Sequence, residues 1–228
     1  MITVDHICLG VQNLYEGTFR LREETGFGDY DGGWFPTSSL ANRIVPLGND
    51  TYIEVESVID AHKLRQGDPT SVWFDDCVRS GDVFIGWCAR VDTRAELDRI
   101  AKRLNENVLE DALKRSPDGR LAAGVARVPG AVPCWKAGRP NFFYFPEMDT
   151  HPARLTPTSP VSNPPLGLSY LELGGTAEEM SDWLGLPAEQ LPVRFNGQAE
   201  GLYAVVVNTA SGPVTIRRPN HRSPKLST

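Results

Sequence analysis

Hydrophobic and polar positions change period several times along the chain, and each change marks the boundary of an element. Residues 2–11 alternate between apolar and polar side chains, which is typical of a half-buried strand. Residues 14–22 place apolar side chains on one helical stripe, and Gly26 is a suitable helix stop. Three further strands are predicted over residues 29–35, 40–47 and 51–58. The pattern therefore predicts a first βαβββ unit within residues 1–60.

The same succession of elements is predicted again within residues 81–150. A strand over residues 83–91 precedes a helix over residues 93–104, for which Asp92 or Thr93 is a good N-cap. Three strands are predicted to follow, over residues 107–113, 120–128 and 141–145. The second unit thus has the same order of elements as the first.

A third, degenerate βαβββ unit is predicted within residues 166–218. Its first strand, over residues 166–173, is followed by a short helix over residues 176–184 that opens with the capping-box pattern Thr176-Ala177-Glu178-Glu179. Short strands follow over residues 193–195, 202–208 and 214–217. The separators between units are residues 61–80 and the proline-rich residues 149–165, and residues 219–228 form a tail.

Composition and charge narrow the class of protein. Of the 228 residues, 40% are hydrophobic and 23% are charged, as in an ordinary globular protein. The net charge is −6 and basic residues form no long cluster, which argues against nucleic-acid binding because phosphate backbones need concentrated positive charge. No apolar run reaches the roughly 18 residues of a membrane-spanning helix, the first residues lack a signal-peptide pattern, and the four cysteines lack CxxC spacing. We therefore expect a cytoplasmic protein that acts on a small molecule.

Four stretches of sequence carry a resemblance to a known superfamily. They are Asp5-His6-Ile7-Cys8-Leu9-Gly10-Val11 and residues 42–54, 85–92 and 116–121. In order and spacing they resemble the vicinal oxygen chelate superfamily, which includes glyoxalase I, extradiol dioxygenases, fosfomycin-modifying enzymes and bleomycin-binding proteins, and within it the glyoxalase-like domain branch. The resemblance implies an α+β fold in which βαβββ modules pair into a curved mixed sheet around a cleft. It also implies a divalent metal ion held by the first and last strands of each module.

His6 and Glu54 are the metal ligands that this resemblance implies. Strand alternation places them opposite the apolar Ile7 and Ile53, so both side chains can face the cleft. An imidazole and a carboxylate on adjacent strands suit a divalent ion such as Zn, Fe, Mn, Ni or Co. The alternative for His6 is a buried histidine that is hydrogen-bonded to a neighbour.

The second unit departs from the metal pattern of the superfamily. Its position matching His6 is Gly86, and its position matching Glu54 is Phe145, or Glu147 if the register slips by two. The sequence thus predicts one half of a metal site, and loss of the site is the alternative.

The third unit offers polar side chains at the matching positions. Tyr170, Glu172 and Arg217 can supply a ligand, a general acid and an anion clamp, or they can form a salt-bridged surface. We therefore name Tyr170 and Glu172 as candidate catalytic residues, together with Glu56 on the same strand face as Glu54.

Further side chains are candidates for contact with a substrate. The planar guanidinium of Arg90 suits a carboxylate or phenolate, and the run of aromatic residues 142–145 offers an apolar wall. The substrate-binding candidates are Arg90, Phe143, Phe145, Tyr52, Cys88, and Trp34 as a lid or rim. Packing or surface pairing is the alternative for each of them. His62, His151 and His221 are interpreted as bystanders in linkers or the tail.

Three functions remain open at this point. The first is a metal-dependent enzyme of the lyase, isomerase or dioxygenase type, acting on a small oxygen-rich or aromatic molecule. The second is a metal-free binding or resistance protein with the same fold, and the third is a metal-free enzyme that uses Arg, Tyr and Glu side chains. An odd number of units leaves one unpaired. Because sheet edges tend to be covered, we also expect a homodimer, and packing of the third unit on the first two is the alternative.

Overall fold

The large sheet of the protein is built from two βαβββ halves placed side by side. The computed structural model describes residues 1–35, 38–111 and 125–220. The eight strands of this sheet have the order β2-β3-β4-β1-β5-β8-β7-β6. Strands β1 and β5 pair antiparallel at its centre and join the two halves. The expected α+β fold with a curved mixed sheet is confirmed.

The first half follows the predicted pattern closely. Its elements are β1 (Ile2–Gly10), α1 (Leu14–Thr25), β2 (Tyr30–Phe35), β3 (Leu40–Gly48) and β4 (Thr51–Val58). Helix α1 begins after Asn13, whose side chain accepts hydrogen bonds from the backbone N–H groups of Tyr15 and Glu16. It ends at Gly26, which has the left-handed φ of 75° that glycine adopts without strain.

The second half contains β5 (Val83–Val91), α4 (Arg94–Leu104), β6 (Leu109–Asp111), β7 (Val125–Val128), α5 (Ala131–Lys136) and β8 (Asn141–Tyr144). Thr93 caps α4 by accepting a hydrogen bond from the backbone N–H of Glu96. Parts of the two strands expected over residues 107–113 and 120–128, and the stretch 116–121, lie outside the described residues. Strand β8 pairs parallel with β5, just as β4 pairs parallel with β1. The two halves therefore share one strand topology.

The third segment has the predicted succession of elements in a different arrangement. Its elements are β9 (Pro165–Gly174), α6 (Ala177–Leu184), η3 (Ala188–Gln190), β10 (Val193–Phe195), β11 (Gly201–Thr209) and β12 (Val214–Arg217). The strand order is β10-β9-β11-β12, so the first strand lies between the second and the third. In the first half the first strand lies beside the last. The third segment thus forms a separate four-stranded sheet with its own topology.

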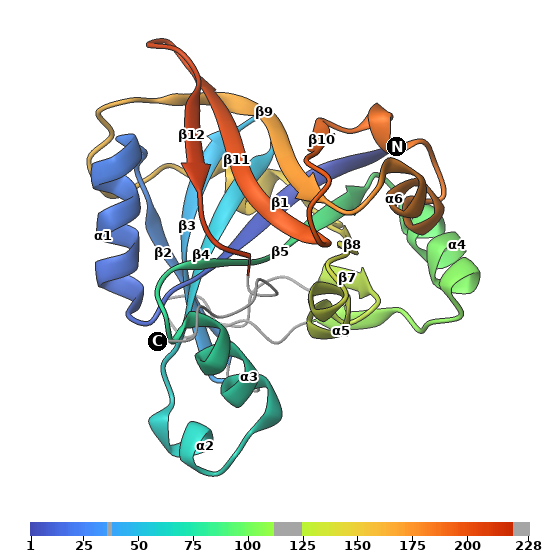
Figure 1. Ribbon diagram of the computed structural model, residues 1–228, viewed down its shortest axis with the longest axis horizontal. Coiled ribbons are helices and arrows are strands. Elements are labelled where there is room, and N and C mark those ends of the chain that lie inside the picture. The colour runs from blue at the N-terminus through green and yellow to red at the C-terminus, as the bar shows by residue number, and fades with distance from the viewer. Residues whose placement is uncertain (36–37, 112–124, 221–228) are drawn as a thin grey trace.

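The small sheet covers one face of the large sheet. Figure 1 shows β9, β11 and β12 in front of the large sheet, between α1 on one side and α4 with α6 on the other. Ile7 and Ile53 from the large sheet share one buried apolar cluster with Leu171 and Val205 from the small sheet. Because side chains alternate along a strand, the neighbours of these residues point away from this core.

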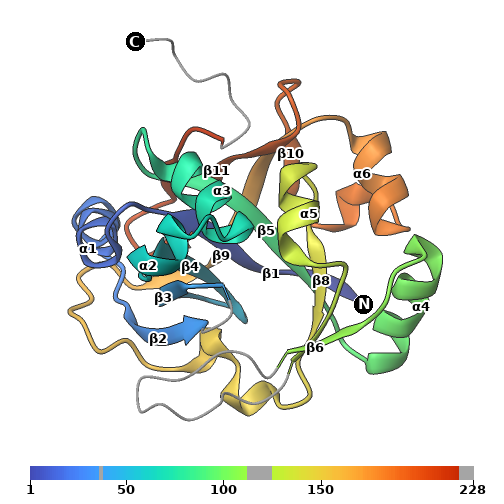
Figure 2. The ribbon, with the colours of Figure 1, turned by 90° about the horizontal axis from the view of Figure 1, so that it is seen from below.

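Helices pack on the opposite face of the large sheet. This face carries α2 (Ala61–Arg65), α3 (Pro69–Val78) and α5 in the view of Figure 2. Phe74 of α3 and Trp135 of α5 form a second buried cluster with Cys8 and Ile85. Residues 61–80 were expected only to separate units. Asp68 followed by a proline nevertheless starts α3, because the Asp68 carboxylate caps the helix at Ser71 N–H.

The helices of the described segments are all too short, or too polar, to cross a lipid bilayer.

Candidate metal centre

Three side chains that could ligate a metal ion meet on the helix-covered face of the large sheet. His6 of β1 lies opposite Cys88 of β5, and Cys8 lies two residues further along β1. The potential ligand atoms of His6, Cys8 and Cys88 all lie within 4.8 Å of one another. All three residues are buried, with exposed fractions of 3%, 0% and 0%. We call these three residues the His6–Cys8–Cys88 cluster.

Glu54 lies next to this cluster on β4. It is the direct neighbour of Cys8 in the parallel β1–β4 pair, and its Oε2 lies 3.6 Å from Nε2 of His6. The side-chain amide of Asn42 donates a hydrogen bond to the other carboxylate oxygen. The structure thus brings the two ligand candidates His6 and Glu54 together, and it adds two thiols that the resemblance did not name.

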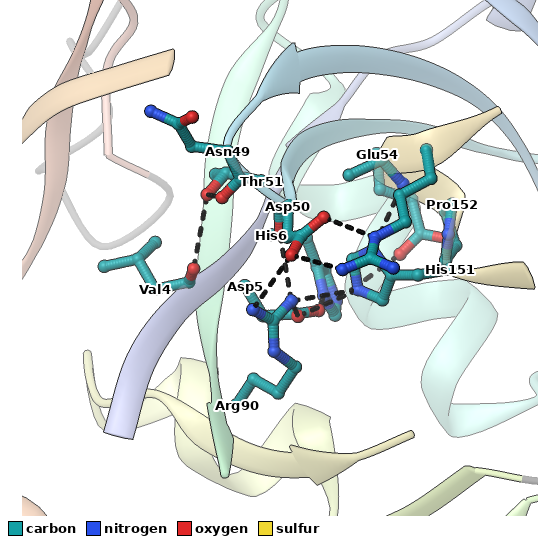
Figure 3. A network of polar contacts seen from close by, with 12 residues as sticks. Val4, Asp5, His6, Asn49, Asp50, Thr51, Glu54, Arg90, His151 and Pro152 are labelled. Atoms are coloured by element: carbon teal, nitrogen blue, oxygen red, sulfur yellow. Dashed lines mark hydrogen bonds and ion pairs between the residues drawn. The ribbon is translucent and has the colours of Figure 1, made fainter. Parts of the chain in front are cut away.

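Asp5 orients the imidazole of His6. Its Oδ2 lies 2.7 Å from Nδ1 of His6, and its Oδ1 accepts from Arg90 at 3.0 Å and lies 3.1 Å from Nε2 of His151 (Figure 3). The register of β1 against β5 shifts between Val4 and His6, which marks a bulge at Asp5. This bulge brings two consecutive residues to one side of the sheet, where strict alternation would separate them.

The roles of Asp5 and His151 were missed from the sequence. Alternation predicts that Asp5 points away from His6, and His151 was interpreted as a bystander in a linker. His151 is in fact fully buried, and its Nδ1 accepts a hydrogen bond from the N–H of Ala153. With Nδ1 acting as the acceptor, Nε2–H donates to Asp5. The available signal was the Thr150-His151-Pro152 stretch.

The electrostatics of the site reflect burial and close charges. Burial alone would raise the pKa of Asp5, but its hydrogen bonds with His151 and His6 outweigh burial and lower that pKa to about 2. Burial likewise opposes the charged form of His6, yet Cys88 and Asp5 raise the pKa of His6 well above its ordinary value. Burial also favours the neutral thiol of Cys88, but hydrogen bonding with Cys8 and the charge of His6 lower its pKa.

Aromatic rings enclose the imidazoles of His6 and His151. The ring of Tyr52 stacks on His6 at a centroid distance of 4.8 Å, and Phe143 meets His6 edge-on at 5.0 Å. Phe145 contacts His151 at 4.5 Å and stacks with Phe143 at 5.9 Å. Phe143 and Phe145 are half-buried, so they connect the buried cluster with the molecular surface.

Arg90 and Glu56 also lie on this face. The guanidinium of Arg90 donates to Asp5 and to the backbone carbonyl of Asp50, so it is engaged within the protein. Glu56 is buried on β4, with Gly10 as its neighbour on β1 and Asn42 as its neighbour on β3.

Trp34, Tyr170 and Glu172 lie elsewhere in the molecule. Trp34 lines a surface hollow of about 400 Å³ between the start of α1 and strands β2, β3 and β4. Because Leu171 points into the core between the sheets, its neighbours Tyr170 and Glu172 face outward from the small sheet. Glu172 pairs with Arg217 at 2.8 Å, and the guanidinium of Arg194 lies over the Tyr170 ring. The structure does not place these three candidates with the His6–Cys8–Cys88 cluster.

The second half of the large sheet presents a different pair of residues at the matching positions. Cys8 pairs with Glu54, and the corresponding Cys88 pairs with Asn141 of β8. Asn141 is therefore the counterpart of Glu54, and the expected match with Phe145 or Glu147 is wrong. The match depends on which residues of β5 and β8 pair, and the structure pairs Cys88 with Asn141.

The remaining position, Gly86, is covered by an aromatic ring. A Cβ atom at Gly86 would lie 2.3 Å from Cδ1 of Trp135. The indole therefore occupies the space that a side chain at position 86 would need.

The donor set of the cluster fits a divalent metal ion. A metal-binding histidine commonly donates its second ring N–H to a carboxylate, and Asp5 is placed to accept this bond from Nδ1 of His6. Nε2 of His6 then faces the thiols and Glu54. One imidazole nitrogen and two thiol sulfurs suit zinc or a similar borderline ion, with Glu54 beside them as an oxygen donor.

The fold and this arrangement of a central histidine between two βαβββ halves define a vicinal oxygen chelate protein. Residues 4–158 match the model of the family described as "Glyoxalase-like domain", and the chain belongs to this family. No curated protein matches the chain.

Solved structures are similar to this chain at low sequence identity. A hypothetical protein from Staphylococcus aureus aligns over 100% of this chain and 88% of its own, at 11% identity and a TM-score of 0.54. A methylmalonyl-CoA epimerase from Mycobacterium tuberculosis aligns over 62% of this chain and 85% of its own, at 11% identity and a TM-score of 0.44. A variant of the methylmalonyl-CoA epimerase from Streptomyces coelicolor, in complex with 2-nitronate-propionyl-CoA, aligns over 64% of this chain and 100% of its own, at 13% identity and a TM-score of 0.46.

Proposed function

We propose that this chain is a divalent-metal-dependent enzyme that acts on a small oxygen-rich or aromatic molecule, with chemistry of the lyase, isomerase or dioxygenase type. The observation that carries the proposal is the buried His6–Cys8–Cys88 cluster, whose ligand atoms lie within 4.8 Å of one another. Buried imidazole and thiol groups at this spacing, with an oriented histidine, are the parts from which a protein builds a metal centre.

His6, Cys8 and Cys88 would hold the ion, with Glu54 beside them. A bound divalent ion would supply Lewis-acid stabilisation of developing negative charge on a substrate oxygen. Asp5 keeps the imidazole of His6 in one orientation through its 2.7 Å contact with Nδ1. Glu54, 3.6 Å from Nε2 of His6, completes the donor set on the β4 side.

The surrounding side chains would bind the substrate and move its proton. Phe143, Phe145 and Tyr52 offer ring faces and edges to an apolar part of the substrate. Glu56 lies two residues beyond Glu54 on the same strand face, and we assign it the transfer of a proton to or from a bound substrate. Arg90 acts indirectly. Its guanidinium donates hydrogen bonds to Asp5 and to the backbone carbonyl of Asp50, and through Asp5 it supports the orientation of His6.

Elemental analysis tests this proposal. The protein is purified without chelator or affinity metal, incubated with Zn, Mn, Fe, Co and Ni in turn, and compared with His6→Ala. The matched control is His62→Ala, because His62 lies on the exposed surface of α2. We expect close to one equivalent of metal in the wild type and in the control, and loss of that metal in His6→Ala. No metal in the wild-type protein would reject the proposal.

A metal-free binding or resistance protein is the second candidate function. It is favoured by the second half of the sheet, where Gly86 lies under Trp135 and offers no ligand atom. A protein of this kind binds one small molecule per chain with the same affinity in the presence and absence of a chelator. Screening by thermal shift, with and without chelator, separates the two functions.

We also propose a homodimer. Strands β2, β6, β10 and β12 are the outer strands of the two sheets, and exposed strand edges tend to be covered by another element or chain. Light scattering at micromolar concentration tests this proposal, and a monomeric mass would reject it.

A further inference from the structure

Asn141 is a buried amide with no hydrogen-bond partner in the part of the chain that the structure describes. It begins β8 and has no exposed surface. Neither its Oδ1 nor its Nδ2 has a hydrogen-bond partner among the described residues. A buried polar group left unpaired costs stability, and most such groups in native proteins are satisfied by protein, water or a ligand. This amide therefore calls for an occupant that pairs with both of its atoms.

The position of Asn141 identifies where that occupant lies. Asn141 is the direct neighbour of Cys88 in the parallel β5–β8 pair. The next residue, Phe142, belongs to the core between the two sheets, whereas Phe143 contacts His6. By alternation, Asn141 shares the face of Phe143 and Cys88 and borders the His6–Cys8–Cys88 cluster.

A second buried donor, on Trp135, also lacks a partner within the described segments. The indole N–H of Trp135, which is 7% exposed, has no partner among the described residues. Trp135 packs over Gly86, the residue two positions before Cys88, and belongs to the same buried cluster as Cys8 and Cys88. Two amide hydrogens, one indole hydrogen and one amide oxygen are thus available beside the cluster.

We propose that Asn141, assisted by Trp135, recognises the carboxylate and hydroxyl groups of a small α-hydroxy acid held beside the His6–Cys8–Cys88 cluster. Nδ2 of Asn141 and the indole N–H donate to a carboxylate oxygen, and Oδ1 of Asn141 accepts from the hydroxyl group. A metal ion bound to Oδ1 would leave the Nδ2 hydrogens unpaired, so a small molecule accounts for both atoms and an ion alone does not. This inference rests on the proposed function, because it names the substrate class of the same site.

The test compares Asn141→Leu with the wild-type protein in three measurements. Leucine keeps the branched side-chain skeleton of asparagine and replaces both polar atoms by methyl groups. The measurements are zinc content, thermal unfolding of the metal-free protein, and calorimetric titration of the zinc-loaded protein with glycolate, with acetate as the analogue that lacks the hydroxyl. Asn196→Leu is the matched control, because Asn196 donates to Glu172 on the small sheet and lies outside the site.

We expect glycolate to bind the wild type and Asn196→Leu more tightly than acetate does. Asn141→Leu should weaken glycolate binding about tenfold or more, keep its zinc, and unfold at the same or a higher temperature, since an unpaired amide contributes no stability. This combination identifies a residue kept for binding rather than for folding.

Four results would overturn the inference. The first two are unchanged glycolate binding by Asn141→Leu and no glycolate binding by the wild type. The third is loss of zinc from Asn141→Leu, which would make Asn141 a metal ligand, and the fourth is a clearly lower unfolding temperature of that variant, which would make the amide structural. A wild-type protein that takes up no zinc rejects the proposed metal enzyme instead. Titration of the metal-free wild type and of metal-free Asn141→Leu with glycolate then decides the role of Asn141. Weaker binding by the variant supports that role, and unchanged binding or no binding by the wild type rejects it.

Discussion

The carboxylate of Asp5 and the imidazole of His6 lie 2.7 Å apart although the two residues are consecutive in one strand. The bulge between Val4 and His6 makes this contact possible, because it cancels the alternation that would send the two side chains to opposite faces. A carboxylate on Nδ1 fixes the ring and leaves Nε2 for another partner. This contact links the backbone of β1 directly to the chemistry of the site.

Replacing Asp5 by asparagine should weaken metal binding. An amide cannot supply the negative charge that strengthens His6 as a ligand, so we expect metal affinity to fall by about 10- to 100-fold. Competition with a chromophoric chelator measures this change. Asp60→Asn is a suitable control, because Asp60 caps the exposed helix α2. Equal affinities for Asp5→Asn and the wild type would show that the contact does not support a metal ligand.

Asp5 should also make stability depend on pH in the acid range. Its pKa falls from an ordinary value of 3.8 to about 2 in the folded protein, because burial, which would raise it, is outweighed by the hydrogen bonds from His151 and His6. Because the pKa of Asp5 is lower in the folded protein, its ionisation stabilises the fold at pH values above the unfolded-state pKa. This stability is lost as the pH falls from about 4 towards 2. The difference between the two pKa values corresponds to about 2 kcal/mol of unfolding free energy.

Urea unfolding at a series of pH values measures this dependence. The free energy of unfolding of the wild type should approach that of Asp5→Asn as the pH falls through this range. A difference between the two proteins that stays constant down to pH about 2.5 would contradict the predicted ionisation of Asp5.

Spectroscopy of the cobalt-substituted protein should reveal thiolate ligands. If Cys88 binds the ion, Co(II) gives an intense sulfur-to-metal charge-transfer band in the near ultraviolet. Cys88→Ser should weaken this band, since Cys8 would remain as a thiolate ligand. Cys77→Ser should leave it unchanged, because Cys77 lies outside the His6–Cys8–Cys88 cluster. A cobalt spectrum without such a band in the wild type would restrict the ligands to His6 and Glu54.

The small sheet should carry no part of the activity. Glu172 and Arg217 form a partly exposed ion pair on its outer face, and such pairs contribute about 0–1 kcal/mol. Glu172→Gln should therefore change the free energy of unfolding by less than about 1 kcal/mol and leave the metal content unchanged. Loss of metal in this variant would return Glu172 to the candidate site.

The fold could be predicted because it rests on local patterns. Alternation in β1 and β4, and the capping signals at Thr93 and Thr176, depend on neighbouring residues and are readable in one chain. The arrangement of the third segment could not be read in this way, since a succession of strands does not determine which strands pair. Its strand β9 pairs with both β10 and β11, a choice made by packing on the large sheet.

The site was only partly predictable for the same reason. His6 and Glu54 share a face by simple alternation, and the structure places them 3.6 Å apart. Cys88 could not be placed beside His6 from the sequence, because the two residues become neighbours only through the β1–β5 pairing. His151 is 146 residues from Asp5 in sequence, and no local pattern reports a contact of this range.

The asymmetry between the two halves can be tested at Gly86. An alanine there would place Cβ 2.3 Å from the indole of Trp135, so the ring must move or the strand must shift. Overpacking of this kind typically costs about 1–3 kcal/mol, and we expect Gly86→Ala to lose that much in urea unfolding. Gly130→Ala is the control, because its Cβ would meet only ordinary contacts at 3.7 Å or more, and it should change stability by less than about 0.5 kcal/mol. If Gly86→Ala unfolds like the wild type, the indole of Trp135 does not fill the space beside position 86. The second half of the sheet would then have room for a metal-ligating side chain at the position that matches His6.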